Sequence, residues 1–82
     1  MQEVIVKIDG VEEKINATHV FPSKNPATQR FCVNLYYKEK YRKKWVQVFC
    51  GEEYLEEPAR ELAKKINEGK ITDLTGYLAE RR

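Results

Sequence analysis

Hydrophobic and polar residues alternate along the first part of the chain, which is the periodicity of a β-strand with one buried face. The alternating hydrophobic positions are Val4, Val6 and Ile8. Asp9-Gly10 follows them, and an Asp-Gly pair between two alternating segments is a strong signal for a two-residue hairpin turn. Such a turn places Val4 opposite Ile15. The sequence therefore predicts a hairpin over residues 3–16, with a further extended segment near 17–21.

A second alternating region predicts another hairpin, over residues 29–50. Its strands are expected near 29–38 and 43–50, joined by a loop of four residues from Glu39 to Arg42. Between the two hairpins, a proline-containing segment that begins at Pro22 indicates a loop.

Two registers are open for this second hairpin. In one register Cys32 lies opposite Cys50, and a cross-strand disulfide becomes possible. In the other register Val33 lies opposite Val48, so hydrophobic side chains share one face while polar and aromatic side chains share the other. A shift of one residue destroys this separation. The second register is therefore favoured, and it predicts free thiols.

Beyond residue 55 the hydrophobic spacing changes to that of a helix. Residues at i, i+3, i+4 and i+7 form one hydrophobic stripe: Ala59, Leu62, Ala63 and Ile66. Pro58 suits the first helical position and Gly69 favours termination, so a helix is predicted over residues 57–68. A second, short helix is expected over residues 73–80, with Thr72 as its N-cap. Its inward-facing side chains would be Leu74, Tyr77 and Leu78.

These elements predict an α+β, mainly β fold: a three- to five-stranded antiparallel sheet with a C-terminal helix packed on one face. A chain of 82 residues is expected to form a single domain, residues 1–82, with a small core. The sequence has no run of about 18 hydrophobic residues, so no membrane partner is expected. The N-terminus lacks the basic and apolar segments of a secretory signal, so a cytoplasmic location is expected.

Basic charge and aromatic rings are concentrated in the second hairpin. Residues 29–50 contain six basic residues and one acidic residue, a net charge of +5, whereas the whole chain carries +2. The same segment holds six of the nine aromatic residues. Cations attract a polyanion over long distances, and rings offer flat surfaces for bases or sugars. The segregation indicates nucleic-acid binding; the alternative is a solvated hairpin whose rings belong to the core.

In the favoured register, one exposed face carries side chains that could stack on bases or bind their edges: Asn34, Tyr36, Trp45, Gln47 and Phe49. The basic residues around that face would contact phosphates: Arg30, Lys38, Lys40, Arg42 and Lys43. Tyr37 is expected on the core side, and Tyr41 at the loop tip, where a ring has little to pack against. The alternative for Trp45 is ordinary packing under the helix.

The sequence offers little for catalysis, so no enzyme is expected. His19 is the only histidine, and strand alternation places it with Phe21 as a partly buried structural residue. Ser23 is the only serine and has no nearby base. Cys32 and Cys50 are too far apart for a CxxC motif, and the chain has no glycine-rich phosphate loop. No metal site and no cofactor are expected.

Two stretches resemble a known family: Val4-Ile5-Val6-Lys7-Ile8-Asp9-Gly10-Val11-Glu12-Glu13-Lys14 and Glu57-Pro58-Ala59-Arg60-Glu61-Leu62. Together with the order of elements over roughly residues 3–66, they resemble the small seven-kilodalton archaeal chromatin proteins. The resemblance implies a Src-homology-3-like barrel that binds duplex DNA in the minor groove, largely without sequence preference. Separately, lysine and glutamate supply 21 residues and glutamine three, a balance typical of hyperthermophile proteins.

The chain also departs from that family. The family is richer in lysine, and its sheet strands join through a glycine-rich turn, where this chain has residues 38–42. The loop from Pro22 to Gln29 is longer than the family's turn that carries an apolar wedge, so no wedge residue is transferred. Residues 70–82 have no counterpart. Three strands and a helix also resemble the arm-binding domains of tyrosine integrases, which read the major groove with their sheet.

The expected function is therefore non-catalytic binding of duplex nucleic acid, with double-stranded DNA as the partner, through a basic, aromatic sheet face. The alternative is a small protein-interaction module, such as a viral or plasmid-type regulator or inhibitor, that offers the same face to a protein partner. An uncovered edge strand could pair two copies, so a monomer or an edge-strand dimer is expected.

Overall fold

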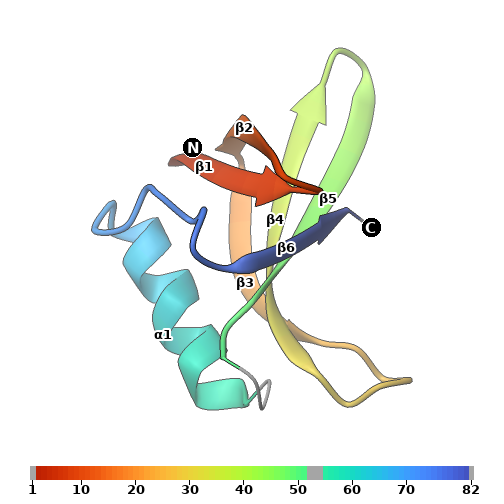
Figure 1. Ribbon diagram of the computed structural model, residues 1–82, viewed down its shortest axis with the longest axis vertical. Helices are drawn as coiled ribbons and strands as arrows, with labels where there is room; N and C mark the ends of the chain where they lie inside the picture. The colour runs from red at the N-terminus through yellow and green to blue at the C-terminus, as the bar shows by residue number, and fades with distance from the viewer. Residues whose placement is uncertain (1, 52–54, 82) are drawn as a thin grey trace.

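Two antiparallel sheets and one helix make up the described part of the chain, residues 2–51 and 55–81, in a computed structural model (Figure 1). The elements follow in the order β1 (Gln2–Ile8), β2 (Val11–Ala17), β3 (His19–Lys24), β4 (Phe31–Glu39), β5 (Arg42–Phe49), α1 (Glu56–Asn67) and β6 (Leu78–Arg81). Strands β1 and β2 form the smaller sheet, and the larger sheet has the order β3-β4-β5-β6. The predicted α+β, mainly β class is confirmed.

The N-terminal hairpin has the predicted register. Val4 lies opposite Ile15, and Ile8 lies opposite Val11 at the turn. Asp9 and its neighbouring glycine both adopt a positive φ, 51° and 78°, as a type I′ turn requires. The turn and the alternating pattern thus specify the same pairing.

The register of the second hairpin is also confirmed. Val33 lies opposite Val48, and both side chains are fully buried. The connecting turn is shorter than predicted, because Glu39 pairs with Arg42 and only two residues remain between the strands. Lys40 in this turn adopts a left-handed φ of 57°, which lets the chain reverse in so short a loop.

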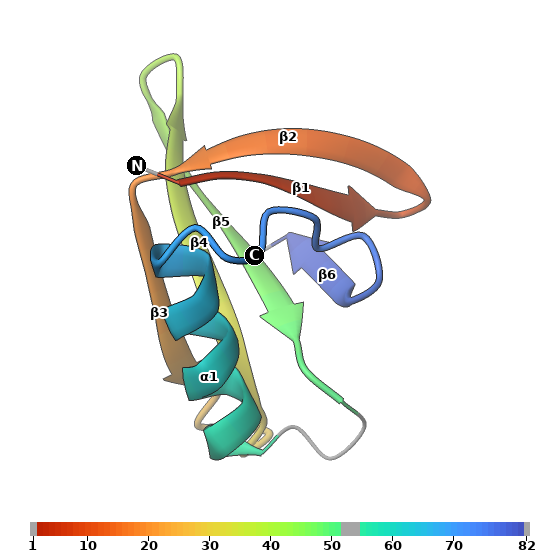
Figure 2. The ribbon, with the colours of Figure 1, turned by 90° about the vertical axis from the view of Figure 1, so that its left-hand side faces the viewer.

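One face of the larger sheet carries the core. Helix α1 packs against β3 and β4, β2 packs against β4, and β1 packs against β6. Figure 2 shows α1 along the lower part of this sheet and the β1–β2 hairpin across its upper part. Their buried side chains form one cluster, which includes Val6 from β1, Leu35 from β4 and Leu62 from α1. The other face of the sheet, which we call the outer face, is covered by no described helix or strand.

The helix is placed almost as predicted. Its buried residues are the predicted stripe: Ala59, Leu62, Ala63 and Ile66. It begins at Glu56, so Pro58 occupies the third helical position and not the first; the first turn tolerates this because its N–H groups lack helical partners. Gly69 follows the C-cap with φ 72°, and its N–H donates to the Ile66 carbonyl at 3.0 Å.

The segment after the helix contains a strand, so the prediction of a short helix over residues 73–80 is wrong. Strand β6 pairs with the edge of β5. Just before it, the Ile5 N–H donates to the Thr72 carbonyl at 2.8 Å, and the Leu74 N–H donates to the Ile5 carbonyl at 2.7 Å. Pairing with β1 and β5 therefore uses backbone N–H and C=O groups that a helix would bond within itself. Gly76 also has a low helix propensity.

The side chains of this segment divide between core and surface. Leu74 is buried as predicted, and Tyr77 packs half-buried against the core. Leu78 is 56% exposed, contrary to prediction, and Ala79 takes the buried position instead. The difference follows from strand geometry, in which successive side chains point to opposite faces.

Both cysteines are buried thiols that form no disulfide, as the favoured register predicts. Burial raises the pKa of the Cys50 thiol, and nearby Cys32 raises it further. Since the thiolate is the reactive form and both side chains are buried, we expect neither thiol to react appreciably with a thiol-specific chromophore near neutral pH. The same reagent should count both thiols after denaturation. Rapid labelling of the native protein would contradict this prediction.

Candidate nucleic-acid interface

A row of aromatic side chains crosses the outer face from β3 to β5. Phe21 lies edge-to-face with Trp45, with ring centroids 5.8 Å apart. Tyr36 contacts the same indole at 4.6 Å, and His19 contacts Tyr36 at 5.5 Å. We call these four rings the aromatic row. With Lys43 they line an open hollow of about 440 Å³.

Strand pairing explains why these rings meet. Tyr36 lies directly opposite His19 on one side and directly opposite Trp45 on the other. Side chains of directly paired residues share a face of the sheet, so the three rings adjoin. Trp45 is therefore half-buried among rings on the outer face, and it does not pack under α1.

Basic residues gather at the turn end of the β4–β5 hairpin. Lys38 lies directly opposite Lys43 on the outer face, two residues further along each strand than Tyr36 and Trp45. We call the four exposed cations here the basic tip: Lys38, Lys40, Arg42 and Lys43. In the described ranges none of the four forms a salt bridge.

The single acid of this hairpin is already paired. The Lys44 ammonium donates to the Glu39 carboxylate at 3.0 Å. This hydrogen bond and the charge of Lys44 lower the pKa of Glu39, so the carboxylate stays ionised. Because that ion pair is internally neutral, the positive charge of the basic tip remains available to an anion.

The structure brings together only part of the predicted set. Tyr36 and Trp45 lie in the aromatic row, while Gln47 and Phe49 are half-buried further along β5. Arg30 precedes β4 and lies at the opposite end of that strand from the basic tip, roughly 25–30 Å away. The predicted ring of cations is therefore a cluster at one end and an arginine at the other.

The prediction that Asn34 is exposed is wrong. Its side chain points to the predicted face but is only 2% exposed. Phe21 and Gln47 flank it on the neighbouring strands, and the Cys32 thiol donates to its Oδ1 at 3.4 Å. Strand alternation fixes the face of a side chain and not its accessibility, which depends on the size of its neighbours. Asn34 is therefore not accessible to a base edge.

Sequence reasoning missed two members of the aromatic row. His19 is exposed, although it was expected to be partly buried, and its Nδ1 lies 3.0 Å from the Thr18 hydroxyl. Phe21 is 37% exposed. Alternation did place both on one face of an extended segment, but it could not show that this segment pairs with β4.

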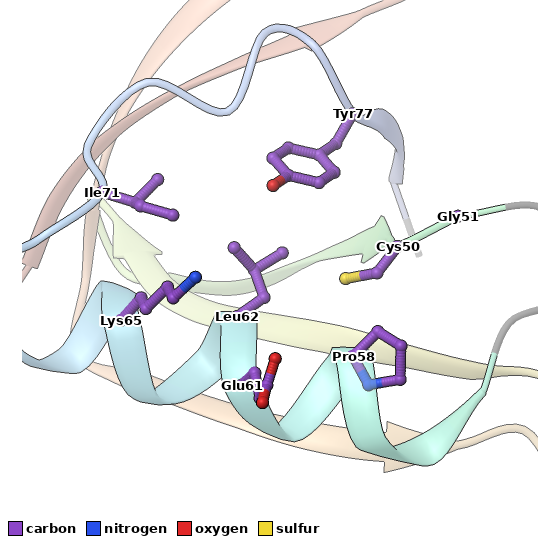
Figure 3. A pocket seen from close by; sticks show the side chains of 8 residues that line it. All are labelled: Cys50, Gly51, Pro58, Glu61, Leu62, Lys65, Ile71 and Tyr77. Carbon is purple, nitrogen blue, oxygen red and sulfur yellow. The ribbon is translucent and has the colours of Figure 1, made fainter.

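A second hollow lies on the opposite side of the molecule, between α1 and the segment that leads to β6 (Figure 3). Its volume is about 290 Å³. The side chains of Cys50, Leu62 and Tyr77 point into it, and Glu61 and Lys65 lie on α1 at its side. This hollow shares no residue with the aromatic row or the basic tip.

No family model matches the chain, and no curated protein or solved structure matches it significantly. Within the described residues, no group of three or more His, Cys, Asp or Glu side chains could hold a metal ion. No described helix is long and apolar enough to cross a membrane.

Proposed function

We propose that the chain binds duplex DNA, without catalysis, through the aromatic row and the basic tip. The observation that carries the proposal is the pair of lysines, Lys38 and Lys43, directly opposite each other beside the paired rings of Tyr36 and Trp45. Like charges directly opposite each other destabilise a sheet. A phosphate bound between the two ammonium groups attracts both of them and offsets their mutual repulsion. The lysine pair is therefore more stable with an anionic ligand bound than without one.

The spacing of these pairs suits a nucleic acid. Two residues along each strand separate the ring pair from the lysine pair, a distance of about 7 Å. Rings stack on bases or wedge between base steps, while lysines contact the phosphates beside them. Neither type of contact reads a base edge, and Asn34 is buried, so binding is expected to depend little on sequence.

The resemblance to the archaeal chromatin proteins supports duplex DNA as the ligand. An N-terminal hairpin, three strands and a helix follow in the order of that family, and this chain adds β6. We propose that the two sheets correspond to the family's Src-homology-3-like barrel. With the lysine and glutamate balance, the same resemblance suggests a chromatin-like protein of the cytoplasm of a thermophilic archaeon.

The test is a titration that follows Trp45 fluorescence while short mixed-sequence duplex DNA is added. Trp45 is the only tryptophan and lies in the aromatic row, so its signal reports on the proposed site. We expect quenching that added salt reverses. If the four cations of the basic tip contact four phosphates, log affinity falls with a slope of about −3.6 against log salt. An unchanged signal at low salt, together with unchanged anisotropy of labelled DNA, would reject the proposal.

One observation favours a second candidate function. Leu78 is 56% exposed and lies opposite Phe49, so β6 adds an apolar side chain to the outer face. Glu80 on the same strand lies opposite Gln47 and adds a negative charge. Such a mixed edge suits a protein partner, for which the aromatic row would supply anchoring residues. A protein-partner surface predicts no salt-dependent binding of mixed-sequence DNA.

A further inference from the structure

His19 lies at one end of the aromatic row, and one of its two ring nitrogens is already engaged. Its Nδ1 lies 3.0 Å from the Thr18 hydroxyl, and the same hydroxyl donates to the Tyr36 carbonyl at 3.2 Å. A hydroxyl has a single proton to donate, so both contacts are hydrogen bonds only when Nδ1 carries a proton and donates to the Thr18 oxygen. Because the side chain is exposed, Nε2 is then the nitrogen that a ligand can reach.

Protonation decides what Nε2 can bind. With a proton on Nδ1, the neutral ring presents the Nε2 lone pair, which repels a phosphate oxygen. The imidazolium instead presents an N–H donor and a positive charge, which together form a charge-assisted hydrogen bond to phosphate. Histidine is the side chain that ordinarily gains this charge as the pH falls from about 8 to about 5. The hydrogen bonds of Thr18 thus make phosphate binding at Nε2 depend on protonation.

His19 and a cation of the basic tip lie at the same hollow of the outer face. This hollow is lined by His19 from β3, Tyr36 from β4 and Lys43 from β5, together with Phe21 and Trp45. From the spacing of the strands, the Cα atoms of His19 and Lys43 lie about 12 Å apart. Both side chains can therefore reach phosphates of one nucleic-acid strand that runs across the hollow.

The ionisable groups on the elements around His19 are mainly basic, and the acid among them is paired: Tyr36, Lys38, Lys43, Lys64 and the Glu3–Lys14 ion pair. In the part of the chain that the structure describes, no carboxylate forms a salt bridge with His19. The lysines of the outer face repel a charged imidazole, whereas a bound phosphate attracts it. An anionic ligand therefore favours the charged ring more than the free protein does.

From this geometry we propose that His19 binds a phosphate of duplex DNA as the imidazolium, so that DNA binding takes up a proton and strengthens as the pH falls. The inference rests on the proposed function and adds a fifth phosphate contact to those of the basic tip. Nδ1 donates to Thr18, Nε2 donates to the phosphate, and Lys43 holds the same strand across the hollow. Because phosphate favours the charged ring, the added affinity is present at low pH and is lost as the pH rises and the ring loses its proton.

The experiment measures affinity for a short mixed-sequence duplex by anisotropy, at about pH 5.5 and about pH 8 and at several salt concentrations. The wild type is compared with His19→Phe, which keeps a ring but has no titrating nitrogen, and with His19→Lys, which is charged at both pH values. His19 is the only histidine, so the two variants leave no other imidazole to titrate. Circular dichroism at both pH values checks that each variant is folded.

At about 0.1 M salt, the wild type should bind roughly fivefold to tenfold more tightly at the lower pH, and the slope of log affinity against log salt should steepen from about −3.6 to about −4.5. His19→Phe should show the same affinity and the same slope at both pH values. His19→Lys should show the steeper slope at both. Calorimetry in two buffers of different ionisation enthalpy should detect proton uptake when the wild type binds DNA, and none for His19→Phe.

Two results would reject the role of His19 and leave the proposed function standing. One is a wild type that binds the duplex equally well at both pH values. The other is a His19→Phe variant that keeps the pH dependence of the wild type. If the wild type binds the duplex at neither pH, both the role of His19 and the proposed function are rejected.

Discussion

Replacing Trp45 with alanine should weaken the binding of duplex DNA by roughly five- to 150-fold, since a base stacked on an aromatic ring contributes about 1–3 kcal/mol. Trp45 contacts both Phe21 and Tyr36, so its loss also leaves these two rings without the side chain that they both pack against. The effect should therefore exceed that of losing a peripheral ring such as His19. Anisotropy titrations at low salt measure the change.

The matched control for Trp45→Ala is Tyr77→Ala. Tyr77 is also aromatic and half-buried, but it packs against the core on the other side of the larger sheet. Its loss should lower the thermal midpoint of unfolding, measured by circular dichroism, and leave the affinity for DNA unchanged while the protein is folded. Equal losses of affinity in the two variants would mean that Trp45 acts through stability alone.

The hairpins could be predicted because each register is fixed by a pattern of period two. At residues 33 and 48, a shift of one position would turn buried valines to the outer face, so a single pairing agrees with the sequence. The aromatic pair Tyr36 and Trp45 follows from the same register. These parts of the candidate site therefore depend only on local pairing.

The rest of the site depends on contacts that are distant in sequence. His19 and Phe21 join the aromatic row only because β3 pairs with β4 across an irregular loop. Burial of Asn34 follows from the side chains on both neighbouring strands, which a single hairpin does not reveal. Strand β6 has four residues and forms because the edge of β5 offers unpaired backbone groups. Its sequence alone carries little strand signal.

Lys38→Glu should stabilise the fold and weaken DNA binding, two effects of opposite direction from one substitution. The introduced carboxylate lies directly opposite Lys43, so a repulsive cross-strand pair becomes an attractive one, which contributes roughly 0.2–1 kcal/mol to the free energy of unfolding. At about 0.1 M salt, each lost phosphate contact reduces affinity by about eightfold. The added repulsion should bring the total to roughly tenfold or more. Chemical denaturation and anisotropy titrations measure the two effects.

The reciprocal variant and the double variant separate function from structure. Lys43→Glu should resemble Lys38→Glu in both stability and affinity. The double variant again places like charges opposite each other, so stability should return toward the wild-type value while affinity falls further, by roughly a hundredfold in total.

Lys64→Glu on the exposed side of α1 changes net charge as each single variant does, and it should leave affinity nearly unchanged. If Lys64→Glu weakened binding as much as Lys38→Glu, net charge and not the basic tip would govern the interaction. If affinity followed stability across the four states of the lysine pair, the pair would act through the fold and not through phosphate contacts.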